Sequence, residues 1–389
     1  MTAQWTARVG INGQLLSDGG TYRSAGVSGY IRQLLTHLPS VAPDIQLTAF
    51  LPGNSQLSVN GMAVKNSGQW NTRRPLQRIL WEQLALPALI DRHDLDLIHG
   101  TVNINPIIAR CPSVISVHDL SFWHYPKAFP TFQRHYLRTM VPRSVQTATR
   151  VIAVSEATRQ DVINAWQVSP ERIDVVYNGV DEGFEPAPSA RVAEFRRQKG
   201  LPERFILHLG TLEPRKNLVH LVAAFDRVKS VVPDASNLKL VLAGGKGWGY
   251  DSIFEEVAKR NLQQDVLFPG YVPDEELVWW YRAAAVFAYP SMLEGFGLPV
   301  LEAMASGTPT VTSMRSSLPE VAGDAAILVD PESQDSLSDA LIAILEDQDL
   351  ADRLVQLGLQ QAARFSWQRT AIETAAVYRK ALGITGGDS

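Results

Sequence analysis

The sequence predicts an α/β protein that consists of two doubly wound, Rossmann-like domains of similar size. Short apolar runs alternate with amphipathic stretches throughout the chain, which is typical of parallel sheets whose strands are joined by helices. A turn-rich segment at 182–190, with Pro186 and Pro188, indicates a linker. At 389 residues and 45% hydrophobic composition, the chain is long enough to bury two separate cores. We therefore expect domains at 1–185 and 186–366.

Each half contains six apolar runs of strand length. In the first half they are Arg8–Asn12, Ile45–Leu51, Leu95–His99, Ser113–Val117, Arg150–Val154 and Ile173–Val176. In the second half they are Phe205–Leu209, Lys239–Ala243, Val266–Phe268, Val286–Ala288, Thr310–Val311 and Ile327–Val329. Helical periodicity lies between them, for example at Leu218–Val231 and Ser336–Glu346. Ligands of such sheets bind outside the carboxyl ends of the strands, so residues that follow these runs are the site candidates.

The composition argues against several classes of protein. The net charge of -4 gives no sign of nucleic-acid binding. Cys111 is the one cysteine of the sequence, which excludes an intrachain disulfide and suits a reducing cytoplasm. The start, Met1–Trp5, lacks a signal-peptide pattern, and no apolar run approaches the ~18 residues of a membrane span. We expect a cytoplasmic protein that contacts a membrane at most peripherally, at its inner face.

Charge is distributed unevenly along the chain. From Lys65 to Arg159 there are twelve Lys and Arg against six Asp and Glu, whereas the chain after Pro186 has 20 basic and 26 acidic residues. This contrast is either surface scatter or the mark of an N-terminal domain that faces an anionic membrane or a diphosphate-lipid acceptor.

One basic segment, which begins near Trp70, illustrates the same alternatives. If Pro75 starts a helix, three apolar side chains fall on one face of it and three arginines lie nearby. These are Leu76, Ile79 and Leu80 on the apolar face, and Arg73, Arg74 and Arg78 beside it. The pattern fits a helix that lies in a membrane interface, and it also fits a helix that packs on the sheet of its own domain.

The most informative motif is the stretch Glu294–Glu302, which follows an apolar run. Its two glycines and Pro299 indicate a tight turn that leads into a helix, since proline is tolerated in a first helical turn. Such a turn presents the backbone N–H groups of Phe296, Gly297 and Leu298 at the positive end of a helix, which suits a phosphate.

Two carboxylates flank this turn. Glu294 precedes the glycines and Glu302 lies inside the expected helix, so they can hold different parts of an elongated ligand. An ionised carboxylate only accepts hydrogen bonds, and sugar hydroxyls are matching donors. A ligand with phosphates in the middle and hydroxyl-rich rings at both ends is a nucleotide sugar. We expect Glu302 on the ribose and Glu294 on the transferred sugar.

Arg215 and Lys216 follow the run Phe205–Leu209 closely, so they should lie at the carboxyl edge of a sheet. Two adjacent cations there can hold a diphosphate, the Arg bidentately and the Lys as a point charge. Asp94 and Asp96 form an Asp-x-Asp pair of the kind that binds metals in some transferases, but the pair leads into a strand. That position is opposite the expected site, so we interpret the pair as structural and predict no metal.

His118 and Asp119 directly follow the run Ser113–Val117. A histidine near neutral pKa can donate to a sugar hydroxyl or move a proton, and Asp119 is a candidate to orient the imidazole. Glycine-rich loops follow other strands, at 19–29 and 244–249. They match neither a dinucleotide fingerprint nor a Walker loop, so each is either a flexible connection or a close approach to the ligand.

Taken together, these segments resemble the retaining glycosyltransferases of family 4, which have the GT-B fold. The matching segments are Glu294–Glu302, Gly210–Asn217, Val117–Asp119, Val154–Glu156, Asn178–Asp181 and Ser316–Val321. The nearest likeness is to bacterial mannosyl- and rhamnosyltransferases that build surface polysaccharides. In GT-B enzymes the last helix, here about Trp367–Leu382, crosses back to the first domain, so the resemblance places 367–389 there.

The resemblance also implies roles for individual residues. Arg215 and Lys216 would neutralise the charge that grows on the leaving phosphate, in place of a metal ion, and His118 would touch the donor sugar near its reacting carbon. The implied catalytic residues are His118, Arg215, Lys216 and Glu294. The implied donor-binding residues are Gly26, Gly210, Arg215, Lys216, Tyr271, Val272, Glu294, Gly295, Phe296, Gly297, Leu298 and Glu302.

The expected activity is transfer of a hexose from a nucleoside diphosphate to a hydroxyl of a saccharide or lipid-linked saccharide, without a metal or other cofactor. GDP-mannose is the preferred donor, ahead of dTDP-rhamnose and UDP-hexoses. Alternatives are a GT-B epimerase, which needs no acceptor, a phosphorylase, which needs inorganic phosphate, and a catalytically silent nucleotide-sugar-binding partner.

Overall fold

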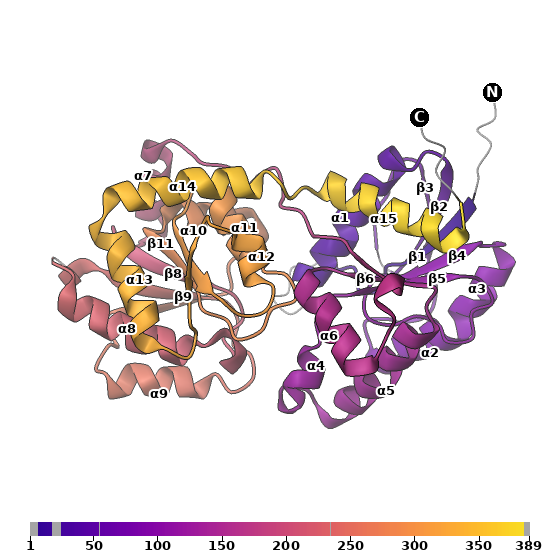
Figure 1. Cartoon of the computed structure of the whole chain (residues 1–389), viewed down its shortest axis with the longest axis horizontal. Coiled ribbons are helices and arrows are strands. Elements are labelled where there is room, and N and C mark those ends of the chain that lie inside the picture. Colours follow the sequence, from indigo (N-terminus) through magenta and orange to yellow (C-terminus); the bar gives the residue numbers. More distant parts are fainter. Residues whose placement is uncertain (1–6, 18–24, 54, 234, 385–389) are drawn as a thin grey trace. The chain divides into compact units, whose positions relative to one another are not determined.

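The computed structural model describes residues 7–17, 25–53, 55–233 and 235–384 (Figure 1). The chain divides into two compact units. The first unit comprises Met1–Gly179 and Ser366–Ser389, and the second comprises Val180–Phe365. The division falls after Gly179, so the turn-rich segment at 182–190 belongs to the second unit. There Arg282 Nε donates a hydrogen bond of 2.5 Å to the carbonyl of Glu185.

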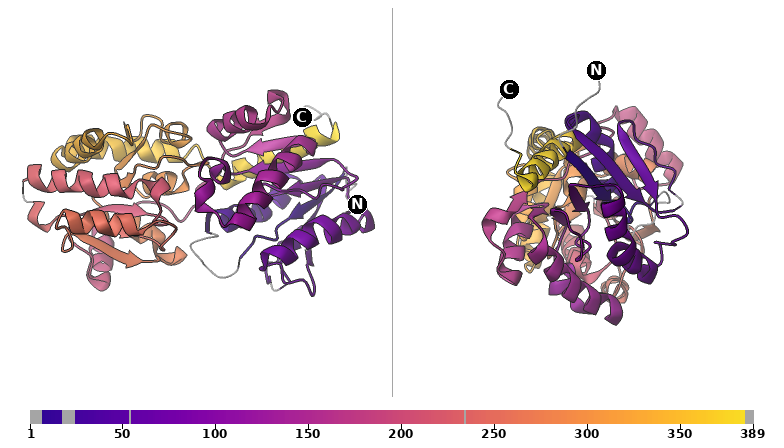
Figure 2. Two further views of the ribbon diagram at one scale, coloured as in Figure 1. Left: turned by 90° about the horizontal axis from the view of Figure 1, so that it is seen from below. Right: turned by 90° about the vertical axis from the view of Figure 1, so that its right-hand side faces the viewer.

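The first unit is built on a seven-stranded parallel sheet in the order β3-β2-β1-β4-β5-β6-β7. The strands are β1 (Ala7–Asn12), β2 (Ile45–Leu51), β3 (Met62–Asn66), β4 (Leu97–Gly100), β5 (Ser113–Val117), β6 (Arg150–Ala153) and β7 (Ile173–Val175). The chain moves outward in one direction from β1 and in the other from β4, so the switch point of this doubly wound sheet lies between those two strands. Strands β4, β5 and β6 are almost entirely buried because helices cover both sides of the sheet (Figure 2).

The helices of the first unit follow the strands in the usual alternation. They are α1 (Ala25–Val41), α2 (Pro75–Leu80), the π-helical turn η1 (Trp81–Ala85), α3 (Leu86–Arg92), α4 (Ser121–His124), η2 (Pro126–Ala128), α5 (Thr131–Thr147), α6 (Glu156–Trp166), η3 (Pro170–Arg172) and α15 (Trp367–Leu382). Ser155 caps α6, since its side chain accepts the N–H of Thr158.

The last helix, α15, packs on the first unit, as expected for a GT-B chain. The buried hydroxyl of Tyr378 lies 2.7 Å from Nδ1 of His99, a residue of β4. Arg379 forms a two-pronged ion pair with Asp44, at 3.1 and 2.5 Å. The chain can cross back because Gly179 passes close to the start of α15: a Cβ on Gly179 would lie 2.1 Å from the backbone nitrogen of Trp367.

One face of α2 is exposed. This observation contradicts one of the two alternatives left open by the sequence, in which the helix packs on the sheet of its own domain. None of the six residues of α2 is buried, and Leu76 and Leu80 are 61% and 47% exposed. Leu84, one further turn along, is also 61% exposed. These three side chains therefore do not pack on the sheet of their own unit, and that alternative is wrong for them. We refer to Leu76, Leu80 and Leu84 as the apolar stripe.

The second unit is built on a six-stranded parallel sheet in the order β10-β9-β8-β11-β12-β13. The strands are β8 (Phe205–Leu209), β9 (Lys239–Ala243), β10 (Val266–Gly270), β11 (Val286–Tyr289), β12 (Thr310–Ser313) and β13 (Ile327–Val329). The switch point lies between β8 and β11. Apolar residues of these strands and of α8 and α13 form one core, with Phe225, Leu240 and Leu341 fully buried.

The helices of the second unit connect these strands. They are α7 (Ser189–Lys199), η4 (Pro214–Lys216), α8 (Leu218–Val231), η5 (Ala235–Asn237), α9 (Asp251–Lys259), η6 (Asp274–Glu276), α10 (Leu277–Ala283), α11 (Leu298–Ala305), α12 (Leu318–Ala322), α13 (Gln334–Glu346) and α14 (Gln348–Ala362). In the described part of the chain, no helix is both long enough and apolar enough to cross a membrane.

The predicted α/β class, two doubly wound sheets and returning C-terminal helix are confirmed. All twelve expected strands are present, with ends within two residues of those expected. The strand β3 was missed because it lies at the sheet edge and is largely exposed, so Met62–Asn66 has no apolar run.

Candidate active site

The turn at Glu294–Leu298 joins β11 to α11 in the second unit. Gly297 begins the helix at φ +111°, a left-handed conformation that favours glycine, and a Cβ there would lie 2.8 Å from Leu318. Pro299 follows in the first turn, as the sequence indicates. The N–H groups of Gly297 and Leu298 make no hydrogen bond within the described residues, so the helix start can receive an anion.

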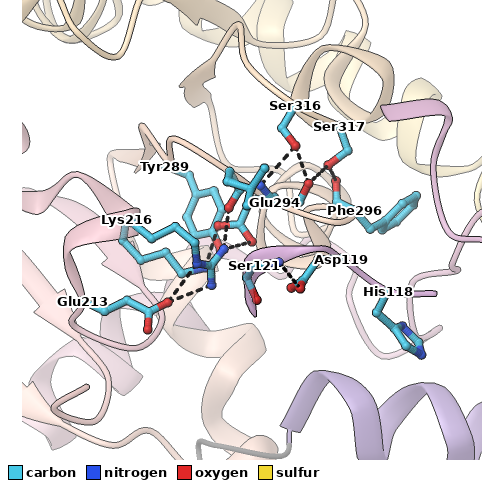
Figure 3. Close-up of polar contacts among 12 residues, drawn as sticks. His118, Asp119, Ser121, Glu213, Lys216, Tyr289, Glu294, Phe296, Ser316 and Ser317 are labelled. Carbon is cyan, nitrogen blue, oxygen red and sulfur yellow. Dashed lines mark hydrogen bonds and ion pairs between the residues drawn. The ribbon is translucent and has the colours of Figure 1, made fainter. Parts of the chain in front are cut away.

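Two serines at the start of α12 hold this turn in place. Ser316 Oγ accepts the N–H of Glu294 at 3.2 Å and donates to its carbonyl at 2.5 Å. Ser317 Oγ contacts the carbonyls of Glu294 at 3.0 Å and Phe296 at 2.7 Å. The turn is therefore fixed from β12 as well as from its own strand (Figure 3).

Glu294 contacts both cations that the sequence singled out, and Figure 3 labels it beside one of them, Lys216. Its Oε2 is 3.0 Å from Arg215 Nη1, and its Oε1 is 2.7 Å from Lys216 Nζ. Arg215 also donates from Nε and Nη2 to Glu213 Oε1, at 3.1 and 2.7 Å. The cations come from η4 after β8, and Glu294 follows β11, so the cluster spans the switch point of the sheet.

The electrostatics of this cluster depend on its burial. Burial alone would raise the pKa of Glu294, but Arg215 and Lys216 outweigh it and hold the pKa at about 2. Burial lowers the pKa of Lys216, and Glu294 partly offsets that effect. With Glu213 included, two cations face two carboxylates, so the charges of this cluster balance one another.

The stacked rings of Tyr289 and His208 pack next to Lys216. Lys216 Nζ donates to the hydroxyl of Tyr289 and lies 4.7 Å from the centre of that ring. The ring of Tyr289 stacks on His208 at 5.4 Å. His208 donates from Nδ1 to the carbonyl of Ala288, and burial followed by the charge of Lys216 lowers its pKa to about 3. The His208 imidazole therefore stays neutral near the Lys216 cation.

Glu302 lies inside α11, as expected, in the second turn of the helix. It is partly buried, and its Oε2 accepts a hydrogen bond of 2.8 Å from Tyr281. Burial raises the pKa of Glu302 to about 7, although the hydrogen bond from Tyr281 acts in the opposite direction. The carboxylate is thus poised to titrate near neutral pH.

The glycine-rich loops of this unit meet at the same sheet edge. A Cβ on Gly244 would lie 1.9 Å from the carbonyl oxygen of Gly210, so this close approach of the loops after β8 and β9 requires glycine. Gly244 also donates to the carbonyl of Gly270 at 2.7 Å. Tyr271 follows as a 39% exposed ring and Val272 is 5% exposed, and their expected donor-binding role stays a prediction.

His118 follows β5 in the first unit and is held by its neighbours there. Its Nε2 lies 2.8 Å from the carbonyl of Thr101, and a carbonyl only accepts, so Nε2 carries the proton. Burial lowers the pKa of His118, which leaves Nδ1 as an acceptor in the neutral ring. The contact with Thr101 engages the Nε2 proton, and the expected contact of His118 with the donor sugar stays a prediction.

The suggested role of Asp119 is also wrong. Asp119 Oδ1 accepts the N–H of Ser121 at 2.8 Å, while Thr101 and the edge of the Tyr30 ring hold the imidazole of His118. The ring centres of Tyr30 and His118 are 4.6 Å apart. Asp119 thus shapes the start of α4 (Figure 3).

The remaining candidates of the first unit have less defined surroundings. Gly26 is exposed in the first turn of α1, and residues 18–24 of the loop before it lie outside the described residues. Asp94 Oδ2 pairs with Arg8 Nη1 at 3.2 Å, and Asp96 Oδ2 accepts the Arg8 N–H at 2.7 Å. Both contacts lie at the amino end of β1, in agreement with the structural interpretation of this pair.

Comparison with known proteins agrees with these observations. The model of Glycosyltransferase Family 4 matches residues 24–184, and that of Glycosyl transferases group 1 matches 192–361. O-antigen chain mannosyltransferase B of Escherichia coli is 32% identical over 69% of this chain and 70% of that protein. D-inositol 3-phosphate glycosyltransferase of Corynebacterium glutamicum is 33% identical over 97% of this chain and 96% of that protein.

This chain belongs to glycosyltransferase family 4. Solved structures confirm the GT-B fold of this glycosyltransferase. Sucrose-phosphate synthase of Thermosynechococcus elongatus superposes with a TM-score of 0.75 at 23% identity, over 97% of this chain and 100% of that one. HepE of Anabaena, solved with UDP-glucose, has a TM-score of 0.71 at 19% identity, over 96% of this chain and 100% of that one.

The sequence indicated the charged residues of this glycosyltransferase, but it did not indicate the side chains that hydrogen-bond to them. Arg215, Lys216 and Glu294 come together, as expected for residues at the ends of neighbouring strands. Tyr289 and Tyr281 were missed because they sit in an apolar strand and an apolar helix, where tyrosine resembles any core residue. Ser316 and Ser317 belong to a segment that the sequence analysis matched to the family, and their place shortly after β12 was a signal for a supporting role that could have been used.

Proposed function

We propose that this glycosyltransferase transfers a hexose from a nucleoside diphosphate sugar to a hydroxyl of a saccharide acceptor, with retention at the anomeric carbon. The observation that carries the proposal is the buried contact of Glu294 with both Arg215 and Lys216 beside the open start of α11. This arrangement offers cations and backbone N–H groups to a diphosphate and a carboxylate to sugar hydroxyls.

The proposed mechanism is substitution on one face of the sugar. The bond from the anomeric carbon to the leaving phosphate breaks, the acceptor oxygen bonds to the same face, and the departing phosphate takes the acceptor's proton. Arg215, Lys216 and the start of α11 stabilise the charge that develops on the phosphate. In this scheme Glu294 holds hydroxyls of the transferred sugar, and Glu302 holds the ribose.

The contacts of His118 support one specific role, that of a hydrogen-bond acceptor. The Nε2 proton is used in the hydrogen bond to the carbonyl of Thr101, so Nδ1 of the neutral ring can accept a hydrogen bond from a hydroxyl group. We propose that this atom accepts a hydrogen bond from the donor sugar. The scheme needs no metal because fixed cations do the work of a Lewis acid at the leaving group, and activity should not require one.

The preferred donor is GDP-mannose, and the setting is synthesis of a polysaccharide or glycolipid. Support comes from relatives named as mannosyltransferases, including O-antigen chain mannosyltransferase RfbU of Salmonella typhimurium, which is 30% identical over 72% of this chain and 73% of that protein. Other relatives are not named as mannosyltransferases, so dTDP-rhamnose and UDP-hexoses stay in the test set.

The experiment is a screen of the purified full chain against GDP-mannose, dTDP-rhamnose, UDP-glucose and UDP-galactose. Thermal shift measures binding, and release of nucleoside diphosphate measures slow hydrolysis. We expect one nucleotide family to stabilise the protein and be hydrolysed. Binding of none of them would refute the proposal.

The same screen separates the alternative enzymes. An epimerase would convert the donor to an isomeric nucleotide sugar without an acceptor, and a phosphorylase would release a sugar phosphate when inorganic phosphate is added. A silent binding partner would bind a nucleotide sugar and show neither hydrolysis nor transfer. The buried cations favour the transferase, since they serve a leaving phosphate.

We further propose that the first unit contacts an anionic membrane surface in the cytoplasm. The apolar stripe is exposed at four-residue intervals on α2 and η1, and Arg73 and Arg74, just before α2, are also exposed. Leucines that enter the interface and arginines that meet anionic headgroups make such binding weak and reversible.

A further inference from the structure

A chain of buried hydrogen bonds crosses the first unit from its last helix to its first. In α15 the hydroxyl of Tyr378 lies 2.7 Å from Nδ1 of His99, a residue of β4. The other ring nitrogen, Nε2, lies 2.8 Å from Oγ of Ser116 in β5. That oxygen lies 2.8 Å from the hydroxyl of Tyr30 in α1. None of these four residues is more than 1% exposed, and we refer to them as the buried chain.

His99 is suited to the middle of the buried chain. A neutral imidazole has one nitrogen that donates and one that accepts, and each of its two hydroxyl partners can do either. Burial, followed by the charge of His118, lowers the pKa of His99 to about 3, so the ring stays neutral. The hydrogen bonds of the chain are therefore mutually compatible. A buried polar network whose members are all paired holds them in one arrangement.

The buried chain ends at a ring that packs against His118. The rings of Tyr30 and His118 meet edge to face, with centres 4.6 Å apart and planes at 82°. The Tyr30 ring also contacts Trp367, the first residue of α15, at 6.2 Å between ring centres. Trp367 and Tyr378 are about three helical turns apart, so they lie on one face of α15. That face therefore reaches Tyr30 directly and also through His99 and Ser116.

The orientation of the His118 ring depends on this packing. His118 is partly exposed, and its Nε2 donates to the carbonyl of Thr101. One hydrogen bond fixes the position of one ring atom but leaves the ring free to turn about that bond. The edge contact with Tyr30 restricts this rotation and so sets the direction in which Nδ1 points. A functional side chain is held in a single geometry when packing fixes its rotamer in this way.

We propose that Tyr30 is a positioning residue that sets the direction of the His118 ring, and that the rest of the buried chain, as far as Tyr378 in α15, holds Tyr30 in place. The inference rests on the proposed transferase function, in which Nδ1 of His118 accepts a hydrogen bond from the donor sugar. The proposed contacts with the nucleotide lie in the second unit. Loss of Tyr30 should therefore reduce turnover and leave nucleotide affinity unchanged, since orientation contributes to the rate.

The test uses three substitutions in the full chain. Tyr30→Phe removes the hydroxyl and keeps the ring, Tyr30→Leu removes the ring, and Tyr378→Phe breaks the far end of the buried chain. Tyr136→Phe is the matched control, because it removes a hydroxyl of the same unit that has no hydrogen-bond partner among the described residues. Thermal stability, affinity for GDP and UDP, and kcat with the donor identified in the nucleotide screen are measured for each variant.

A spectroscopic measurement reports on His118 without depending on activity. In protein labelled with ¹⁵N-histidine, NMR detects the Nε2–H group that is bonded to Thr101. The chain has eight histidines, so His118→Gln assigns the signal. We expect this signal to shift in Tyr30→Phe and Tyr378→Phe, to be lost through exchange with water in Tyr30→Leu, and to stay unchanged in the Tyr136→Phe control.

The kinetic expectation follows from the same geometry. The kcat should fall about threefold to tenfold in Tyr30→Phe and Tyr378→Phe, the scale of one lost hydrogen bond. It should fall by up to about 100-fold in Tyr30→Leu, the scale of a misplaced functional group. The dissociation constant for the nucleoside diphosphate should stay within about twofold of wild type in all variants.

Two kinds of result would overturn the inference. One is a His118 signal that is unchanged in the Tyr30 and Tyr378 variants, or that changes while kcat does not. The other is a loss of nucleotide affinity in proportion to the loss of kcat, which indicates general destabilisation. Failure of the wild type to bind any nucleotide sugar would instead refute the underlying function, and the NMR signal would still show whether Tyr30 orients His118.

Discussion

Nucleoside diphosphate affinity should increase with pH through the ionisation of Glu302. Its pKa of about 7 results from burial, and ribose hydroxyls bond more strongly to a carboxylate than to a neutral carboxyl group. With that pKa, about one molecule in ten is ionised at pH 6 and about nine in ten at pH 8. If binding uses the ionised form, the dissociation constant for GDP or UDP should fall about tenfold over this range.

The assay is titration calorimetry at pH 6, 7 and 8 with wild type and Glu302→Gln. The diphosphate titrates in both proteins, so the difference between them isolates Glu302. Affinity of the variant at pH 8 should be lower by roughly 1–3 kcal/mol, the scale of charged hydrogen bonds. Equal pH dependence in the two proteins would remove Glu302 from the ribose site.

The same carboxyl group affects stability in a defined direction. Its pKa is raised in the folded state, so the native protein binds the extra proton between about pH 4.5 and pH 7. The unfolding free energy should therefore fall as pH rises through that window, by at most about 3 kcal/mol from this group. Thermal melts should show Glu302→Gln more stable than wild type at pH 8 and nearly equal to it at pH 5.

Three further predictions concern the rest of the molecule. Glu294→Gln should lower turnover strongly while nucleoside diphosphate affinity stays equal or rises, because Arg215 and Lys216 lose a competing carboxylate; parallel loss of both would refute the division of roles. A metal-stripped assay should lose little activity in EDTA, and an absolute Mg²⁺ or Mn²⁺ requirement at the chemical step would contradict the fixed-cation scheme. Liposome flotation should require anionic lipid and fall with salt, and Leu80→Ser with Leu84→Ser should abolish it; a wild type that never floats excludes the membrane contact.

The structure also changes which arginines should be substituted in the membrane experiment. The sequence grouped Arg73, Arg74 and Arg78 as equivalent surface charges. In the fold Arg78 points toward Glu82, at 4.0 Å, so its substitution would also remove that contact. Only Arg73 and Arg74 are suitable for charge variants, and a matched pair of Arg73→Ser and Arg74→Ser tests the headgroup contact alone.

The sequence by itself determined the α/β class, the strands and the charged residues of the cluster that we propose as the donor site. Periodicity is a local property, and in parallel sheets residues after the strands share one edge, so Arg215, Lys216 and Glu294 could be grouped without coordinates. Only the tertiary structure decided what surrounds the polar groups: Glu302 with Tyr281, His118 with Thr101, and Tyr30 with Ser116. Burial and hydrogen bonding join residues far apart in the chain, and these long-range contacts determine which groups are charged, which donate and which remain free for a ligand.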